Sequence, residues 1–185
     1  MARNEAGLKQ AIEEIGALRE EFYKDVFVPG DANEMNPELE KAMRVALERA
    51  KFGELASGDV PVGAVMLNKD GAIISMGNNQ RELLKDPLAH AEIVAIRNAA
   101  SRLQKSRLDG CTLIVTLEPC AMCAGAIAQS RISKVVFGAW DEKAGAVGSV
   151  WDVLRDPRSI FKVEVTAGVL EKECAVLLTD FFKDK

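Results

Sequence analysis

Apolar residues recur along the chain at two spacings, one typical of helices and one typical of strands. The helical spacing predicts helices over residues 6–24, 37–50, 89–101, 119–129 and 170–182, with a shorter helix over 150–154. Short runs rich in β-branched residues predict strands over 60–67, 72–76, 112–117, 134–137 and 163–166. The turn sequence Asn68-Lys69-Asp70-Gly71 joins the first two strands and predicts a hairpin.

The order of these elements predicts the fold class. Helices and strands alternate after an initial hairpin, which is typical of an α/β protein with a mixed sheet. We therefore expect a five-stranded mixed sheet with helices on both faces, in three α/β/α layers. The strand over 112–117 is almost uniformly apolar, so it is expected to be buried on both faces.

The chain is predicted to hold a single domain with an appended segment at its N-terminus. Pro29-Gly30-Asp31 interrupts the helical pattern, and Asn36-Pro37-Glu38 is a favourable helix start. We assign residues 1–35 to a helical extension and 36–185 to the domain. A loosely docked tail is the simpler interpretation of the extension, and a partner-binding role is the alternative.

Composition restricts the class of protein more than its chemistry. The 185 residues are 48% hydrophobic and 28% charged, as in ordinary soluble proteins, and no apolar run approaches the ~20 residues of a membrane span. No secretory signal is recognisable, and four cysteines are too few for a disulfide scaffold, so we expect a cytoplasmic protein. The net charge of −4 arises entirely within residues 1–36, so charge neither favours nor excludes a nucleic-acid partner.

Two short motifs carry the candidate chemistry. His90 and Glu92 form a His-x-Glu motif, and Pro119, Cys120 and Cys123 form a Pro-Cys-x-x-Cys motif. One imidazole and two thiolates can hold Zn²⁺ in three corners of a tetrahedron and leave the fourth position for water. The motifs lie at predicted helix starts, where unpaired N–H groups favour thiolates. Glu92 would move protons during a hydrolytic deamination, for which this motif pair is a known signature.

Other interpretations of the cysteines remain open at this point. A Cys-x-x-Cys pair can be a redox centre, although the usual aromatic and Gly-Pro context is missing here. A structural zinc would need a fourth protein ligand, which Cys111 or Cys174 could supply. Both are more simply interpreted as small buried groups. A non-catalytic zinc or RNA-binding module is the third possibility.

The chain resembles the bacterial tRNA-specific adenosine deaminases of the cytidine-deaminase-like superfamily over residues 37–183. The motifs that carry this resemblance are Pro61-Val62-Gly63-Ala64-Val65, Asp86–Glu92, Thr116–Ala126, Ser130-Arg131-Ile132, Val135–Ala139, Lys143–Ser149 and Asp180-Phe181-Phe182. Two of them, Asp86–Glu92 and Thr116–Ala126, contain the metal and proton-transfer residues. The resemblance implies the cytidine-deaminase-like fold and one catalytic zinc ion per subunit.

The resemblance also implies the substrate. It implies conversion of adenosine to inosine at the wobble position of a tRNA anticodon stem-loop by a homodimer. Asn79 matches the residue that hydrogen-bonds the flipped base and its ribose, and Asp141 matches an acidic residue near the ribose of the target nucleotide. Loop capping by Asn79 and a solvated turn at Asp141 are the structural alternatives. A deaminase of free guanine, cytosine or a nucleoside, with the same zinc site, is the alternative function.

One departure from the family pattern concerns the RNA-facing surface. The family often has Asn-His where this chain has Ile160-Phe161, which puts any RNA contact at that point in doubt. Several basic residues of the C-terminal half are nevertheless expected to face RNA phosphates. They are Arg131, Lys143, Arg155, Arg158 and Lys162.

Overall fold

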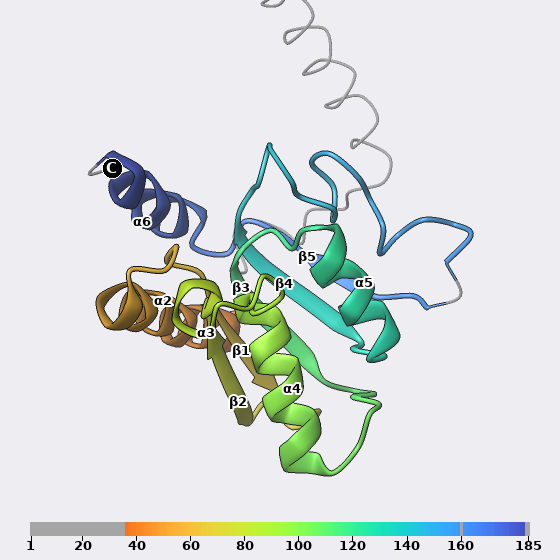
Figure 1. Ribbon diagram of the computed structural model, residues 1–185. Helices are drawn as coiled ribbons and strands as arrows, with labels where there is room; N and C mark the ends of the chain where they lie inside the picture. Colours follow the sequence, from red (N-terminus) through yellow and green to blue (C-terminus); the bar gives the residue numbers. More distant parts are fainter. Residues whose placement is uncertain (1–35, 160, 184–185) are drawn as a thin grey trace, which may run out of the picture. The chain divides into compact units, whose positions relative to one another are not determined.

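The computed structural model describes residues 36–159 and 161–183 (Figure 1). The predicted extension 1–35, with its helix over 6–24, lies outside the described residues. The elements in chain order are α2 (Pro37–Ser57), β1 (Gly63–Leu67), β2 (Ile73–Asn78), α3 (Arg81–Leu84), α4 (Ala91–Leu103), β3 (Thr112–Leu117), α5 (Ala121–Gln129), β4 (Lys134–Ala139), β5 (Glu164–Thr166) and α6 (Glu171–Lys183). In the described ranges, no helix is long and apolar enough to cross a membrane.

The five strands form a mixed sheet, as the sequence predicts. Their order is β2-β1-β3-β4-β5. β1 is antiparallel to both β2 and β3, whereas β3, β4 and β5 are parallel to one another. The expectation of a strand buried on both faces is confirmed, because β3 is central and its residues Leu113–Thr116 are all buried.

Helices cover both faces of the sheet and complete three layers. α2 and α6 pack on one face, against a core that includes Met43, Val65 and Ile114. α4 and α5 pack on the other face, against a core that includes Leu113 and Phe137. The metal-site motifs lie at the starts of α4 and α5, so both belong to the same layer.

Helix α4 approaches strand β2 very closely, and a glycine makes this possible. A Cβ atom at Gly77 would collide with the backbone of Ala91 and come 2.7 Å from the nitrogen of Ala95. α4 also donates two side-chain hydrogen bonds to carbonyls of β2, the edge strand of the sheet. Asn98 Nδ2 lies 3.0 Å from the Met76 oxygen, and Arg102 Nη1 lies 3.1 Å from the Ile74 oxygen. Close packing and these bonds fix the helix that carries His90 and Glu92 to the sheet.

The predicted short helix over 150–154 is wrong. This segment forms turns, with a bridge between Val147 and Asp152. Its backbone donors bond to distant acceptors, since the Val153 nitrogen donates to the Ala146 oxygen and the Trp151 nitrogen to the Gly145 oxygen. Long-range pairing therefore replaces the i to i−4 bonds that a helix would need.

Helix α3, within the predicted loop 77–88, was not expected from the sequence. Its N-cap residue Gln80 supplies no side-chain hydrogen bond. The carboxylate of Asp59 acts as the cap from outside the helix, because its Oδ1 accepts the Glu82 N–H at 2.9 Å and its Oδ2 the Leu83 N–H at 3.3 Å. A capping residue that is distant in the sequence gives no local helix signal.

Replacing this remote cap should destabilise the protein in a pH-dependent way. Burial acts to raise the pKa of Asp59, but hydrogen bonds from the Glu82 N–H, the Ser57 hydroxyl and the Leu83 N–H hold it below its usual value. The ionised form therefore stabilises the fold at neutral pH, and this contribution is lost as pH falls through the lowered pKa. We expect Asp59→Asn to reduce the free energy of unfolding by about 1 kcal/mol at pH 7.

Thermal unfolding of the wild type and of Asp59→Asn at pH 7 and pH 3 would measure the loss of stability. The difference in Tm should shrink at the lower pH, where the wild-type carboxylate begins to protonate. Asp70→Asn, which changes an exposed aspartate in the hairpin turn, is the matched control. Equal Tm values for wild type and Asp59→Asn at pH 7 would contradict the capping role.

Candidate active site

Three side chains from two helix starts converge on a space of the size of a metal ion. His90 occupies the N-cap position of α4, Cys120 the N-cap position of α5, and Cys123 lies in the first turn of α5. The Nδ1 atom of His90 is 3.8 Å from Cys120 Sγ and 3.6 Å from Cys123 Sγ. A tetrahedral zinc ion with bonds of about 2.3 Å to sulfur and about 2.0 Å to nitrogen separates such atoms by about 3.5 Å. The observed donor set and spacing therefore fit zinc.

The local structure leaves these donor atoms available for a metal. Neither His90 nor Cys120 uses its side chain to cap its own helix. A hydrogen bond from the Cys123 side chain lowers the pKa of Cys120 to about 4, with help from His90 and the Cys123 backbone N–H. In return, the pKa of Cys123 is raised, because its thiol donates to Cys120. The pair thus supplies one thiolate readily, and a bound dication would stabilise the second.

Glu92 lies next to this cluster but outside its ligand set. Its side chain is buried in the first turn of α4, and it contacts the thiol of Cys123. Burial raises the pKa of Glu92, so the carboxyl group can hold a proton closer to neutral pH than an exposed glutamate can. A buried carboxyl with a raised pKa beside a metal site is suited to proton transfer.

The other two cysteines do not complete a four-ligand site. Among the described residues, the only group of at least three potential ligands that could hold a metal ion is His90, Cys120 and Cys123. Cys174 is buried in the core between α6 and the sheet, and Cys111 is buried in the core on the opposite face. Both behave as small packed groups, so a zinc ion here would keep one position free of protein ligands.

The structure places Asn79 close to the site in a capping role. Its Oδ1 accepts the backbone N–H of Ala91 at 3.1 Å, and its Nδ2 donates to the Val60 oxygen at 3.0 Å. Ala91 lies between His90 and Glu92, so Asn79 helps to fix the start of α4. The contact of Asn79 with a substrate base stays a prediction.

Asp141 lies in the loop after β4 and shapes its own turn. Its Oδ1 accepts the N–H groups of Lys143 and Ala144 at 3.0 and 3.2 Å. Its backbone N–H donates to Glu118 Oε2 at 3.1 Å, and Glu118 stands two residues before Cys120. Asp141 therefore lies near the first turn of α5, and its contact with a ribose stays a prediction.

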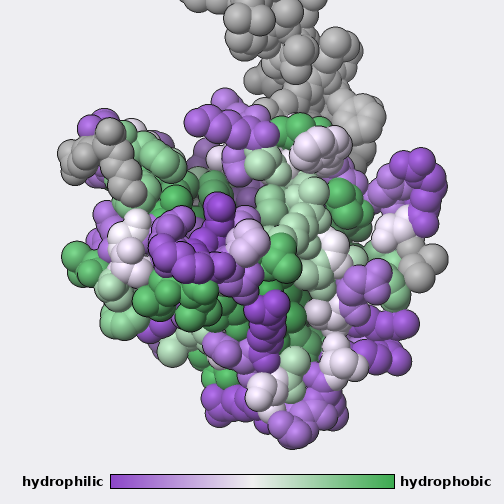
Figure 2. Space-filling model, in the orientation of Figure 1, coloured by the Kyte–Doolittle hydropathy of each residue, from purple (hydrophilic) through white to green (hydrophobic). Residues whose placement is uncertain are grey.

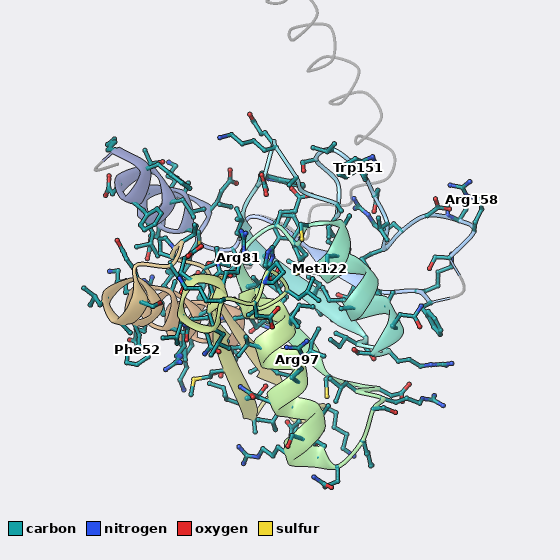
Figure 3. The ribbon with its side chains drawn as sticks, in the orientation of Figure 1. Phe52, Arg81, Arg97, Met122, Trp151 and Arg158 are labelled. Carbon is teal, nitrogen blue, oxygen red and sulfur yellow. The ribbon has the colours of Figure 1, made fainter. Side chains whose placement is uncertain are left out.

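Several residues that surround the site without being ligands were not predicted from the sequence. Arg81, on the unpredicted helix α3, is close enough to lower the pKa of His90 electrostatically, against the larger raising effect of Cys120. Met122 lies between the two cysteine ligands on α5. Figure 3 labels both residues, Arg81 at the start of α3 and Met122 on α5. The contacts of Glu118, within the motif Thr116–Ala126, were also not predicted from the sequence.

The basic residues of the C-terminal half differ in the exposure and the contacts of their side chains. Arg155 is mostly buried and bonds Asp152 and the Val147 oxygen, so it braces the loop. The Arg131 guanidinium stacks 4.5 Å from the ring centroid of Phe161. Arg158 projects outward from its loop, with 88% of its side chain exposed, while it pairs with Asp156 (Figure 3). Ile160, the other half of the departure from the family pattern, lies outside the described residues.

Comparisons with known proteins match this geometry. The family model "Cytidine and deoxycytidylate deaminase zinc-binding region" matches residues 36–139. A second model, "Fumarate reductase flavoprotein C-term", matches residues 1–52, most of which lie outside the described part of the chain. A Haemophilus influenzae protein named tRNA-specific adenosine deaminase is 49% identical over 156 residues, which cover 84% of this chain and 90% of the relative.

Two solved structures share the fold. One comes from a study of A-to-I editing by tRNA:A34 deaminases at the wobble position of transfer RNA. It is 40% identical, with a TM-score of 0.71, and the match covers 75% of this chain and 99% of that chain. The other is a guanine deaminase from Nitrosomonas europaea, 27% identical with a TM-score of 0.64, and the match covers 77% and 83% of the two chains.

Proposed function

Because this chain belongs to the cytidine and deoxycytidylate deaminase zinc-binding family, within its branch of tRNA-specific adenosine deaminases, we propose that it converts adenosine to inosine at the wobble position of a tRNA anticodon. The observation that carries this proposal is the grouping of His90, Cys120 and Cys123 with the buried carboxyl of Glu92. The identity to tRNA-acting relatives over most of the chain supports the choice of substrate.

The residues of the site have distinct tasks in this reaction. His90, Cys120 and Cys123 would hold zinc, which, when bound, supplies the Lewis acidity that lowers the pKa of water toward neutrality. Glu92 takes a proton from the attacking water and passes it to a nitrogen of the adenine ring. A C–O bond forms at the carbon that bears the amino group. Glu92 then takes the remaining proton of the new hydroxyl group and delivers it to the amine, so the C–N bond breaks and ammonia leaves.

We propose Asn79 and Asp141 as the substrate contacts, Asn79 for the base and its ribose and Asp141 for the ribose. Asn79 hydrogen-bonds Ala91, the residue between His90 and Glu92, and Asp141 bonds Glu118 beside Cys120. Both are therefore attached to the two helix starts that carry the metal ligands.

The assembly and location of the protein form a further part of the proposal. We assign residues 36–185 to the deaminase domain and 1–35 to an appended segment. A homodimer would cover exposed apolar side chains of the loop after β4, which include Val150, Trp151 and Val153. On the face that Figure 2 draws, hydrophobic residues (green) lie at the surface among hydrophilic ones (purple). The free thiols of the site suit the reducing cytoplasm.

Product sequencing tests the substrate assignment directly. We expect the purified chain to convert a wobble adenosine in an anticodon stem-loop to inosine, which is read as guanosine on sequencing. Adenosines elsewhere in the same RNA serve as internal controls. A guanine deaminase function is the second candidate, favoured by the structural likeness to the Nitrosomonas europaea enzyme. Ammonia release from free guanine, with none from the stem-loop, would overturn the tRNA assignment.

A further inference from the structure

Glu118 is a buried carboxylate to which the mechanism above gives no task. It is only 2% exposed. Its Oε1 accepts the N–H groups of Val147 and Ser149, each at 2.9 Å, and its Oε2 accepts the N–H of Asp141 at 3.1 Å. No Lys or Arg of the described residues forms an ion pair with Glu118. Three backbone donors from one loop therefore compensate for the burial of this carboxylate.

These bonds belong to a wider attachment between loop 141–149 and the start of α5. The Ala146 N–H donates to the Pro119 oxygen at 2.8 Å, and Cys120 forms a β-bridge with Gly145. Within the loop, the Ser149 hydroxyl donates to the Asp141 oxygen at 2.7 Å. The loop is thus fastened to the residues that immediately precede the metal-binding turn.

The loop approaches the carboxylate so closely that only glycine fits at position 145. A Cβ atom at Gly145 would collide with the carboxylate of Glu118 and with the hydroxyl of Ser149. The backbone at Gly145 has no positive φ, so the requirement here is space and not an unusual conformation. The close contact between loop and carboxylate therefore requires both Glu118 and a glycine at position 145.

We propose that Glu118 is a positioning residue that holds loop 141–149, and with it Asp141, in the geometry that binds the substrate. The inference rests on the proposed deaminase function, because it assigns Asp141 to the substrate. Glu118 acts through the loop, whereas the metal is held by His90, Cys120 and Cys123. Substrate binding should therefore depend on Glu118 more strongly than metal binding does.

The test uses the full chain with Glu118→Gln. The amide keeps the size of the side chain, but its NH₂ group must face at least one backbone N–H that the carboxylate now accepts. We expect KM to rise about tenfold, the effect of about one lost charge-assisted hydrogen bond. Zinc content should stay at the wild-type level, and kcat should change by less than about threefold. A merely structural role would lower the active fraction and kcat while KM stayed unchanged.

Gly145→Ala provides an independent variant, because it disturbs the same contact from the loop side and leaves the carboxylate intact. It should raise KM with zinc retained, and it decides the question if Glu118→Gln does not fold. Glu142→Gln is the matched control, since it removes an exposed carboxylate from the same loop and should not raise KM. Amide hydrogen exchange gives a readout without substrate: the amides of Asp141, Val147 and Ser149 should exchange faster in Glu118→Gln.

Two results would overturn the inference. One is a wild-type KM in both folded variants, and the other is loss of zinc in parallel with loss of activity. KM is measured with whichever substrate the wild type turns over, the stem-loop or a free base. The product of the wild-type enzyme alone decides the proposed function, so the failure of one proposal is distinct from the failure of the other.

Discussion

Replacing Glu92 with alanine should abolish deamination while zinc remains bound. The three ligand side chains come from His90, Cys120 and Cys123, so the metal site stays intact without the carboxyl group. Without Glu92, the site loses the buried carboxyl group that carries a proton from water to the base and to the leaving amine in the proposed reaction. We expect kcat to fall by about 10³-fold, within the range typical of general acid–base residues. Single-turnover inosine formation and the zinc content of the purified protein measure the two effects.

Two further variants make this result specific. Glu92→Gln keeps the shape of the side chain and should be equally inactive, because an amide has no pKa near neutrality and cannot act as a general acid or base. Glu48→Ala removes an exposed carboxylate from α2 and should retain wild-type activity. Loss of zinc from Glu92→Ala would instead make Glu92 a metal ligand, and retained turnover would assign proton transfer to another group.

Removing one thiolate should reduce zinc content and activity together. Cys123 is completely buried, and its Sγ faces His90 Nδ1, so Cys123→Ala leaves a cavity where a ligand stood. Structural zinc sites gain about 10–16 kcal/mol from four ligands, or about 3 kcal/mol each, so the loss of one weakens zinc binding by at least about 100-fold. The zinc content of the purified protein measures the loss of binding. Activity is measured after zinc has been removed with a chelator and then added back. The wild type should recover on zinc addition, and the variant should not.

Cys111→Ala is the matched control for this experiment. Cys111 is also a buried cysteine, but it packs in the core between the sheet and the α4–α5 layer, outside the ligand cluster. Its replacement should leave zinc content at the wild-type level. Equal zinc loss in both variants would favour the structural four-ligand site that the sequence left open.

The fold and the cluster that could hold a metal could be predicted because their signals are local. The apolar run of β3, the amphipathic pattern of α2 and the two ligand motifs each lie within a few consecutive residues. Both helices that carry the candidate ligands cover the same face of the sheet. Their N-terminal ends can therefore lie close together. The family resemblance added the substrate, which no spacing of residues could supply.

The features that were not predicted have a different origin, because they depend on hydrogen bonds to residues distant in the sequence. Helix α3 begins under a cap from Asp59, and the segment 150–154 gives its backbone donors to residues of loop 141–149. Glu118 lies within a sequence motif that gives no sign of its contacts, since its three donors come from Asp141, Val147 and Ser149. Contacts of this kind appear in the folded chain alone and leave no periodic trace in the sequence.

The bonds from α4 to the carbonyls of β2 have a consequence for how molecules of this protein meet. β2 is an outer strand, and outer strands with free acceptors can pair with a strand of another molecule. Asn98 and Arg102 already occupy the acceptors of Met76 and Ile74. An incoming strand would have to displace both side chains before it could bond there. These side chains therefore disfavour edge-to-edge pairing of two sheets through β2. This protects the enzyme from aggregation at this edge, so that molecules would associate through other surfaces.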